Sequence, residues 1–201
     1  MIKLVSIRRI RLVAPEGTVT SRGTAFCPRS SQSVDLAQCE HCPFRSEEGS
    51  APDGLAMTCM IDHVEASPAV GSLVLGPLTC VDAAMPFAAL RTMHVTQRTI
   101  PVIDGPGAKY IGCISRSLLD VARELPPRVR AALLDTARVG DLTTATVAIA
   151  EGATMLEAAR AMTQAGARHL PVVARDGSVA GILDDLTLLN GMSHARSAAT
   201  S

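Results

Sequence analysis

The sequence predicts a mixed α/β (α+β) fold in which two tandem repeats pack as a pseudo-symmetric pair behind a small cysteine-rich N-terminal segment. Three observations support this prediction. The second half of the chain repeats the first half with a shift of 69 residues. Each half combines short apolar runs with one helical pattern, and four of the six cysteines cluster ahead of the repeats.

The repeat is defined by matching apolar and glycine positions that occur in the same order in both copies. These positions are Val70, Gly71, Leu73, Ala89, Met93, Gly112 and Leu119 in the first copy, and Val139, Gly140, Leu142, Ala158, Met162, Gly181 and Leu188 in the second. One inserted residue shifts the register so that Pro101 aligns with Pro171. Internal similarity of this kind predicts one repeated structural unit per copy.

Local signals define the elements of each copy. In the second copy, apolar residues at helical spacing follow Thr154 and Glu157, which form a capping box. The Asp176-Gly177 pair predicts a tight turn between two strands. The expected strands are 99–103, 110–114, 169–173 and 179–183, and the expected closing helices are 116–123 and 185–191.

These elements predict five successive regions. An N-terminal strand and the cysteine segment occupy 1–66, the first repeat 69–123, a linker helix 124–138, the second repeat 139–192 and a flexible tail 193–201. The linker helix is expected to begin at the Pro126-Pro127 pair. The tail is expected to be flexible because its residues are small and polar.

Composition limits the classes of function. The chain has 201 residues, 47% of them hydrophobic, and its 19 basic residues balance its 19 acidic residues. Such a chain is expected to fold and to be soluble. Zero net charge and 2% aromatic residues disfavour nucleic acid as a partner. No run approaches the roughly 20 apolar residues of a membrane helix, so no membrane partner is expected.

The N-terminus predicts a cytoplasmic protein. Arg8, Arg9 and Arg11 interrupt the apolar run that a secretory signal would need. An arginine-rich start without acidic residues leaves an organelle-targeting peptide as the alternative. In the cytoplasm, cysteines are expected to be thiols or metal ligands rather than disulfides.

The cysteine segment predicts a metal site. Cys27, Cys39, Cys42 and Cys59 include one Cys-x-x-Cys pair, and few large hydrophobic residues lie between the first and the last of them. A metal would stabilise a segment with so small a core, and four thiolates suit structural zinc, with an iron–sulfur cluster as the less favoured cofactor. Free or redox-active thiols are the other alternative. His41 and His63 could substitute as ligands, whereas Cys80 and Cys113 are expected to be buried thiols.

The repeat resembles the cystathionine β-synthase (CBS) domain, and two in tandem resemble a Bateman module. The resemblance covers 69–192 and is strongest over Gly166 to Leu189, which contains His169-Leu-Pro-Val-Val and Val179-Ala-Gly-Ile-Leu. It is weaker in the first copy, over Thr99-Ile-Pro-Val-Ile103 and Ile111-Gly-Cys-Ile-Ser115. The cysteine segment resembles a zinc ribbon fused to such modules in some prokaryotic proteins. Modules of this family often form homodimers, so the resemblance implies a homodimer here.

The resemblance also implies adenosine-type ligands in clefts between the copies. The family's pattern is Gly, two residues, Ser or Thr, two residues, Asp. In the first copy Gly112 and Ser115 match, but Leu118 occupies the Asp position; in the second, Asp184 and Thr187 replace the hydroxyl and the Asp. The positions implied in ligand binding are Thr79, Ile100, Pro101, Ser115, Arg116, His169, Asp184 and Thr187.

The predicted function is therefore regulatory rather than enzymatic. The sequence has no Gly-rich phosphate loop, nucleophile elbow or His-Glu-x-x-His motif. We expect a module that binds a small ligand, most simply an adenosine-type nucleotide held weakly, and relays its occupancy to an unidentified regulated protein. The alternatives are an interaction protein with empty clefts and a zinc ribbon that contacts a macromolecule, or a redox or metal sensor.

Overall fold

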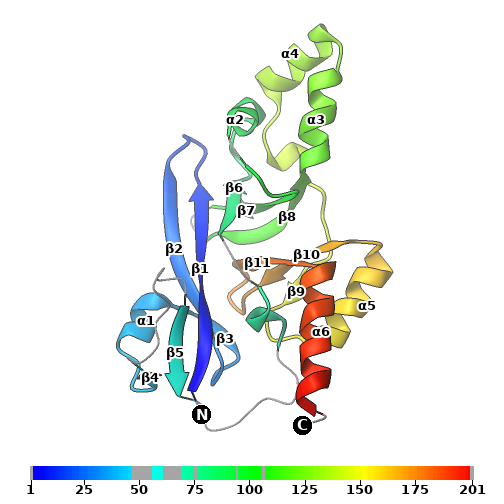
Figure 1. Ribbon diagram of the computed structural model, residues 1–201. Helices are drawn as coiled ribbons and strands as arrows, with labels where there is room; N and C mark the ends of the chain where they lie inside the picture. Colours follow the sequence, from blue (N-terminus) through cyan, green and yellow to red (C-terminus); the bar gives the residue numbers. More distant parts are fainter. Residues whose placement is uncertain are drawn as a thin grey trace.

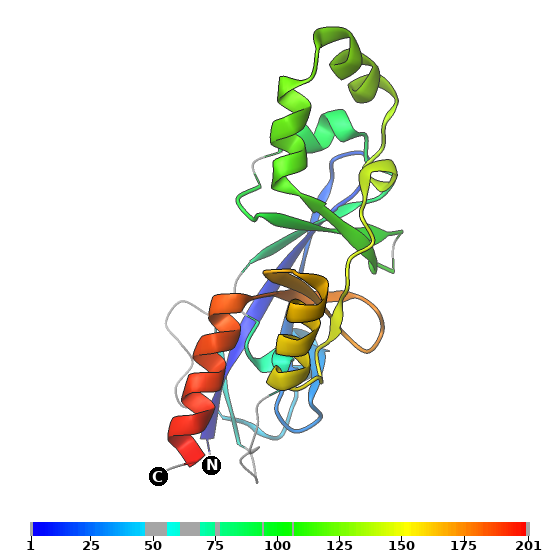
Figure 2. The ribbon, with the colours of Figure 1, turned by 90° about the vertical axis from the view of Figure 1, so that its right-hand side faces the viewer.

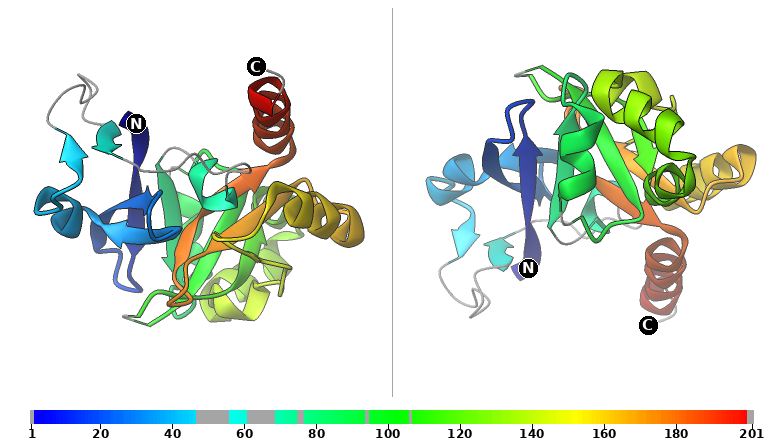
Figure 3. Two further views of the ribbon diagram at one scale, coloured as in Figure 1. Left: turned by 90° about the horizontal axis from the view of Figure 1, so that it is seen from below. Right: turned by 90° about the horizontal axis from the view of Figure 1, so that it is seen from above.

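The computed structural model describes residues 2–46, 56–60, 69–74, 77–93, 95–105 and 107–199. In this part of the chain the two repeats lie one above the other (Figure 2), with their sheets facing each other in the middle and their helices at the outer ends (Figure 1). The N-terminal strands lie beside both repeats (Figure 1, Figure 3). The arrangement is a mixed α/β fold, as predicted.

The N-terminal region forms a sheet around one long strand. Strand β1 (Ile2–Val13) pairs antiparallel with β2 (Val19–Cys27) along its second half and with β5 (Ala56–Met60) along its first half. The other elements are β3 (Gln32–Asp35), α1 (Leu36–Glu40) and β4 (Arg45–Ser46). Asp35 caps α1 by accepting a hydrogen bond from the Ala37 amide at 3.0 Å.

This region is continuous with the first repeat. Strand β1 pairs in parallel with β6 (Leu78–Asp82), so the main path of the described sheet runs β3-β2-β1-β6-β7-β8. The remaining elements of the repeat are α2 (Phe87–Thr92), β7 (Thr99–Asp104), β8 (Lys109–Ser115) and α3 (Arg116–Glu124). The cysteine segment predicted as a separate region at 1–66 therefore shares a sheet with the repeat that follows it.

The linker and the second repeat alternate helices with short strands. They contain α4 (Pro127–Thr136), β9 (Ile149–Ala150), α5 (Met155–Ala165), β10 (His169–Val173), β11 (Val179–Asp184) and α6 (Asp185–Ala199). The capping box of Thr154 and Glu157 is present at the start of α5, and Gly166 ends that helix with φ +58°. Helix α6 continues to Ala199 through the region expected to be a flexible tail, where alanines favour helix.

Each repeat completes its core with a segment from the other. The 3-10 turn η1 (Val70–Ser72) lies at the start of the first repeat, yet the Val70 amide donates to the Ala153 carbonyl at 2.8 Å and its side chain lies in the second core. The turn η2 (Gly140–Leu142) follows Val139, whose amide donates to the Met85 carbonyl at 2.9 Å and whose side chain lies in the first core. The segments that begin at the predicted repeat boundaries, 69 and 139, thus each pack into the core of the other repeat.

Candidate functional site

The candidate site is a cleft of about 640 Å³ between the two repeats. It forms where the extended segment before β9 crosses to the first repeat. Cys113 and Thr144 exchange two backbone hydrogen bonds of 3.0 Å there. The lining residues are Thr99, Cys113, Ser115, Leu118, Leu142, Thr144, Ala145, Thr146, Val147, Ala165, Ala167, Arg168, His169 and Pro171.

Gly112 allows this crossing. A β-carbon at Gly112 would lie 2.6 Å from the Thr144 carbonyl oxygen and 2.5 Å from the Thr143 methyl carbon. At the equivalent place in the second copy, a β-carbon at Gly181 would lie 1.9 Å from a Val74 methyl carbon. The glycines that define the repeat therefore have the same role in both copies: each lets a segment of the opposite repeat approach the backbone.

The cleft combines hydroxyl groups with an apolar wall. Ser115 is the N-cap of α3, where its Oγ accepts a hydrogen bond from the Leu118 amide at 3.3 Å. Arg168 brings a guanidinium to the rim and donates from Nε to Asp185 at 2.9 Å. No carboxylate is among the described residues that line the cleft. The arrangement can hold a flat apolar group and offers hydroxyl, helix N-terminal and cationic groups to an anion.

Two of the eight predicted ligand positions, Ser115 and His169, line this cleft. Ile100 is fully buried in the core of the first repeat, and Pro101 is buried opposite Cys113 in the β7–β8 pairing. Thr79 lies instead beside a different hollow, and its backbone binds the Gln97 side chain through bonds of 2.9 and 2.6 Å.

The other three predicted positions make local contacts. Arg116 donates from Nη1 to the Val95 carbonyl at 2.6 Å. Asp184 accepts bonds from the amide and hydroxyl of Thr187 at 2.7 and 3.1 Å, at the start of α6. In the second copy, therefore, the aspartate at the family's hydroxyl position and the threonine at the family's aspartate position are hydrogen-bonded to each other.

Sequence reasoning missed one wall of the cleft. Thr144 and Thr146 lie on the crossing segment, Thr99 is the first residue of β7, and Arg168 directly precedes β10. The available signal was the run Thr143-Thr144-Ala145-Thr146, a hydroxyl-rich extended stretch before a short strand.

The four predicted metal ligands lie near one another. Cys27 ends β2, Cys39 lies in α1, Cys42 follows in a turn and Cys59 lies in β5. Burial, together with the charges of the other three thiols, raises the pKa of Cys39 to about 11. Even so, the described residues contain no group of three or more His, Cys, Asp or Glu side chains placed closely enough to hold a metal ion.

The structure describes all the remaining cysteine and histidine residues considered in the sequence analysis except His63. All six cysteines lie in the described part of the chain and are free thiols, and Cys80 and Cys113 are buried as expected. His41 is exposed, and its Nδ1 lies 3.0 Å from the Ala37 carbonyl. His63 lies outside the described residues. Among the described helices, none combines the length and apolar character that a membrane crossing requires.

The exchanged segments and the cleft between two similar units define a paired-repeat α/β module. Residues 139–194 match the model of the CBS domain family. A search of curated proteins finds no match.

Solved structures extend this similarity to both repeats. CBSX2 in complex with AMP is 23% identical with a TM-score of 0.51, covering 64% of this chain and 98% of that one. A hypothetical conserved protein from Geobacillus kaustophilus is 19% identical with a TM-score of 0.51, covering 64% and 98%. The CBS domain of a membrane protein from Sphaerobacter thermophilus is 19% identical with a TM-score of 0.50, covering 62% and 88%. The chain therefore has the fold of paired CBS domains.

Proposed function

We propose that this chain is a non-enzymatic regulatory module that binds an adenosine-type nucleotide weakly in the inter-repeat cleft and relays its occupancy to a partner protein. The observation that supports this most directly is the cleft itself, with Ser115 and His169 on its walls. The similar CBSX2 structure was obtained with AMP. The volume of about 640 Å³ falls in the range of small-molecule sites.

The lining predicts weak binding. The start of α3 at Ser115 and the guanidinium of Arg168 offer donors to a phosphate group. Leu118 cannot accept hydrogen bonds from ribose hydroxyls, and a bond to a charged acceptor contributes about 1.5–3 kcal/mol. Its loss corresponds to an affinity roughly ten- to over a hundredfold lower.

Calorimetry with AMP, ATP and adenosine on the full chain tests the proposal. We expect Leu118→Asp to tighten AMP binding about tenfold or more. Ser115→Ala should weaken AMP more than adenosine, because only AMP carries a phosphate. Arg128→Gln, an exposed change on α4, serves as the control. No heat with any of the three compounds, and none after Leu118→Asp, would favour the alternative of an interaction module with empty clefts.

The way in which the cleft is built supports the proposed relay to a partner. A ligand against Thr144 and Thr146 touches the segment that leads to Ile149 in the second repeat, while Ser115 belongs to the first. We therefore expect occupancy to change the contact between the repeats. Hydrogen exchange at the Cys113 and Thr144 amides should slow with AMP, and unchanged exchange at saturation would contradict the relay.

We also propose that Cys27, Cys39, Cys42 and Cys59 hold one structural zinc ion, which is preferred here over an iron–sulfur cluster. The support is that thiols from four separate chain positions lie close enough to influence one another's charge. Zinc would require the thiols to move closer and lose their protons. Elemental analysis should find one zinc per chain, absent after Cys39→Ser and retained after Cys80→Ser. Four freely titrating thiols without metal would favour the redox-sensor alternative.

Homodimerisation and a cytoplasmic location complete the proposal. Leu156 on α5 and Leu186 and Leu189 on α6 are 52%, 66% and 59% exposed, which leaves apolar surface on two neighbouring helices. A second copy of the chain would cover these side chains. Free thiols agree with a reducing compartment.

A further inference from the structure

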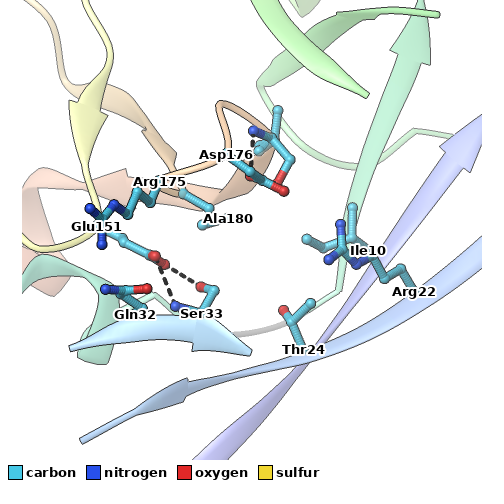
Figure 4. A pocket seen from close by; sticks show the side chains of 12 residues that line it. Ile10, Arg22, Thr24, Gln32, Ser33, Glu151, Arg175, Asp176 and Ala180 are labelled. Carbon is cyan, nitrogen blue, oxygen red and sulfur yellow. Dashed lines mark hydrogen bonds between the residues drawn. The ribbon is translucent and has the colours of Figure 1, made fainter. Parts of the chain in front are cut away.

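A second cavity lies at the junction of the N-terminal sheet and the second repeat, away from the inter-repeat cleft. Its volume is about 310 Å³, at the lower end of small-molecule sites. Strands β1, β2 and β3 form one side, and Glu151 with the β10–β11 hairpin forms the other (Figure 4). We call it the junction cavity; none of its lining residues lines the cleft.

One wall of the junction cavity is held rigidly. Glu151 is 3% exposed and accepts bonds from both the amide and the hydroxyl of Ser33 (Figure 4). Arg8 is 2% exposed and donates to the same hydroxyl at 3.0 Å and to the Gly71 carbonyl. This network joins β1, β3, η1 and the second repeat, so the cavity is formed before any ligand arrives.

The basic side chains in and around the junction cavity outnumber the acidic ones by one. Glu151 is balanced by Arg8, whose charge it stabilises. Arg22 lies 3.7 Å from Asp35 and also influences Asp176. Asp176 is further balanced by Lys109, which lies outside the lining.

Arg175 is the cation that remains. It is exposed and lines the cavity, and it makes no ion pair or hydrogen bond with the described part of the chain. The lining itself carries two basic and two acidic side chains, and the positive excess comes from charges just outside it. Counted together, four basic groups face three acidic ones, which leaves about one positive unit and favours an anion at the exposed guanidinium; the groups are Arg8, Arg22, Lys109 and Arg175 against Asp35, Glu151 and Asp176.

A buried hydroxyl in the lining lacks a partner. Thr24 is 4% exposed and points from β2 into the cavity (Figure 4). Its Oγ1 is buried and has no hydrogen-bond partner among the described residues. Leaving a buried hydroxyl unsatisfied costs free energy, so such groups usually have a partner in the functional state. Next to it, Ile10, Val179 and Ala180 supply an apolar surface.

We propose that the junction cavity binds a small organic anion, with a carboxylate or phosphate group near Arg175 and an apolar body against Ile10 and Val179. Thr24 and the Gln32 amide supply hydrogen bonds to the ligand. The site is a second input to the module, independent of the nucleotide cleft, and its ligand fastens the N-terminal sheet to the second repeat.

Three matched probes test the chemistry on the full chain: benzoate, phenyl phosphate and the neutral benzamide. By calorimetry or saturation-transfer NMR we expect at least one of the two anions to bind about tenfold or more tightly than benzamide, since a charge-assisted bond is worth at least that factor. A preference for benzoate identifies a carboxylate site, and a preference for phenyl phosphate identifies a phosphate site. Binding of neither anion, or equal binding of benzamide, would overturn the proposal.

Variants locate the site and separate it from the cleft. Arg175→Gln should weaken the bound anion about tenfold and leave AMP binding unchanged, while Arg128→Gln changes neither. Thr24→Val should weaken the probe without lowering the thermal midpoint, because valine removes an unsatisfied hydroxyl. AMP should not compete with the probe. Anion binding that survives both Arg175→Gln and Thr24→Val, or that AMP displaces, shows that the probe lies elsewhere and refutes the proposal.

Discussion

Replacing Arg8 by methionine removes the guanidinium that links three parts of the fold. Arg8 binds the Ser33 hydroxyl at 3.0 Å, the Ala180 carbonyl at 3.4 Å and the Gly71 carbonyl. Methionine fills similar space but leaves Glu151 buried without its positive neighbour. Arg8 and Glu151 are connected through the Ser33 hydroxyl rather than by a direct ion pair. Removing one partner of a direct buried pair costs about 3–5 kcal/mol, which sets the upper end of the expected loss, against the roughly 5–15 kcal/mol that stabilises a domain.

The pair itself is costly to bury. Burial lowers the pKa of Arg8 from its usual value to about 10, and the attraction of Glu151 only partly offsets this. The difference disfavours the charged form by roughly 3 kcal/mol. Removing both charges in Arg8→Met/Glu151→Gln should therefore cost much less than the sum of the two single changes. We expect a coupling free energy of about 2 kcal/mol or more.

Urea unfolding of the four proteins in this cycle measures these quantities. Arg9→Met, an exposed change at the next position of β1, should alter the free energy of unfolding by less than about 0.5 kcal/mol. If Arg8→Met costs no more than Arg9→Met, or if the two single changes are additive, the network does not hold the junction together as described.

Three further changes test other parts of the fold. Gly112→Ala should destabilise the protein by about 1–3 kcal/mol in urea unfolding and weaken AMP binding, because its methyl group meets the Thr144 carbonyl; an unaffected protein would contradict the close crossing. Leu156→Lys with Leu186→Lys should yield a monomer by light scattering with an unchanged circular dichroism spectrum, and a persistent dimer would place the interface elsewhere. Thr154→Ala should lower stability by about 1 kcal/mol through loss of the α5 cap, and an unchanged urea midpoint would show that the cap contributes nothing.

Elements with local signals could be predicted from the sequence. The Thr154 and Glu157 capping box, the apolar run of β10 and the Asp176-Gly177 turn each lie within a few residues of the structure they specify. The crossing of Val70 and Val139 could not be predicted in this way. Their partners lie in the opposite repeat, and the identity of an apolar residue does not indicate which of two cores it packs into.

The same distinction applies to the cleft. Ser115 and His169 belong to motifs tied to predicted strand ends, and both line the cleft. Thr144 and Thr146 lie on an extended segment with neither strand nor helix periodicity, so the run of hydroxyl residues was the local signal for their place. Ile100 shows the reverse case, because its motif position falls on the core-facing side of β7, where it is fully buried.

The exchange of Val70 and Val139 also makes the pair, rather than the single repeat, the smallest unit in which both cores are complete. A polypeptide ending in the α4 linker would lack the valine that fills the first core, and the complementary fragment would lack the one that fills the second. Each fragment alone would leave a hole the size of a valine side chain, and mixing the two would repair both. A single ancestral repeat would have faced the same deficit, which a second identical chain could satisfy. Duplication within one chain would then have made intramolecular a contact that two separate chains could form only by dimerising.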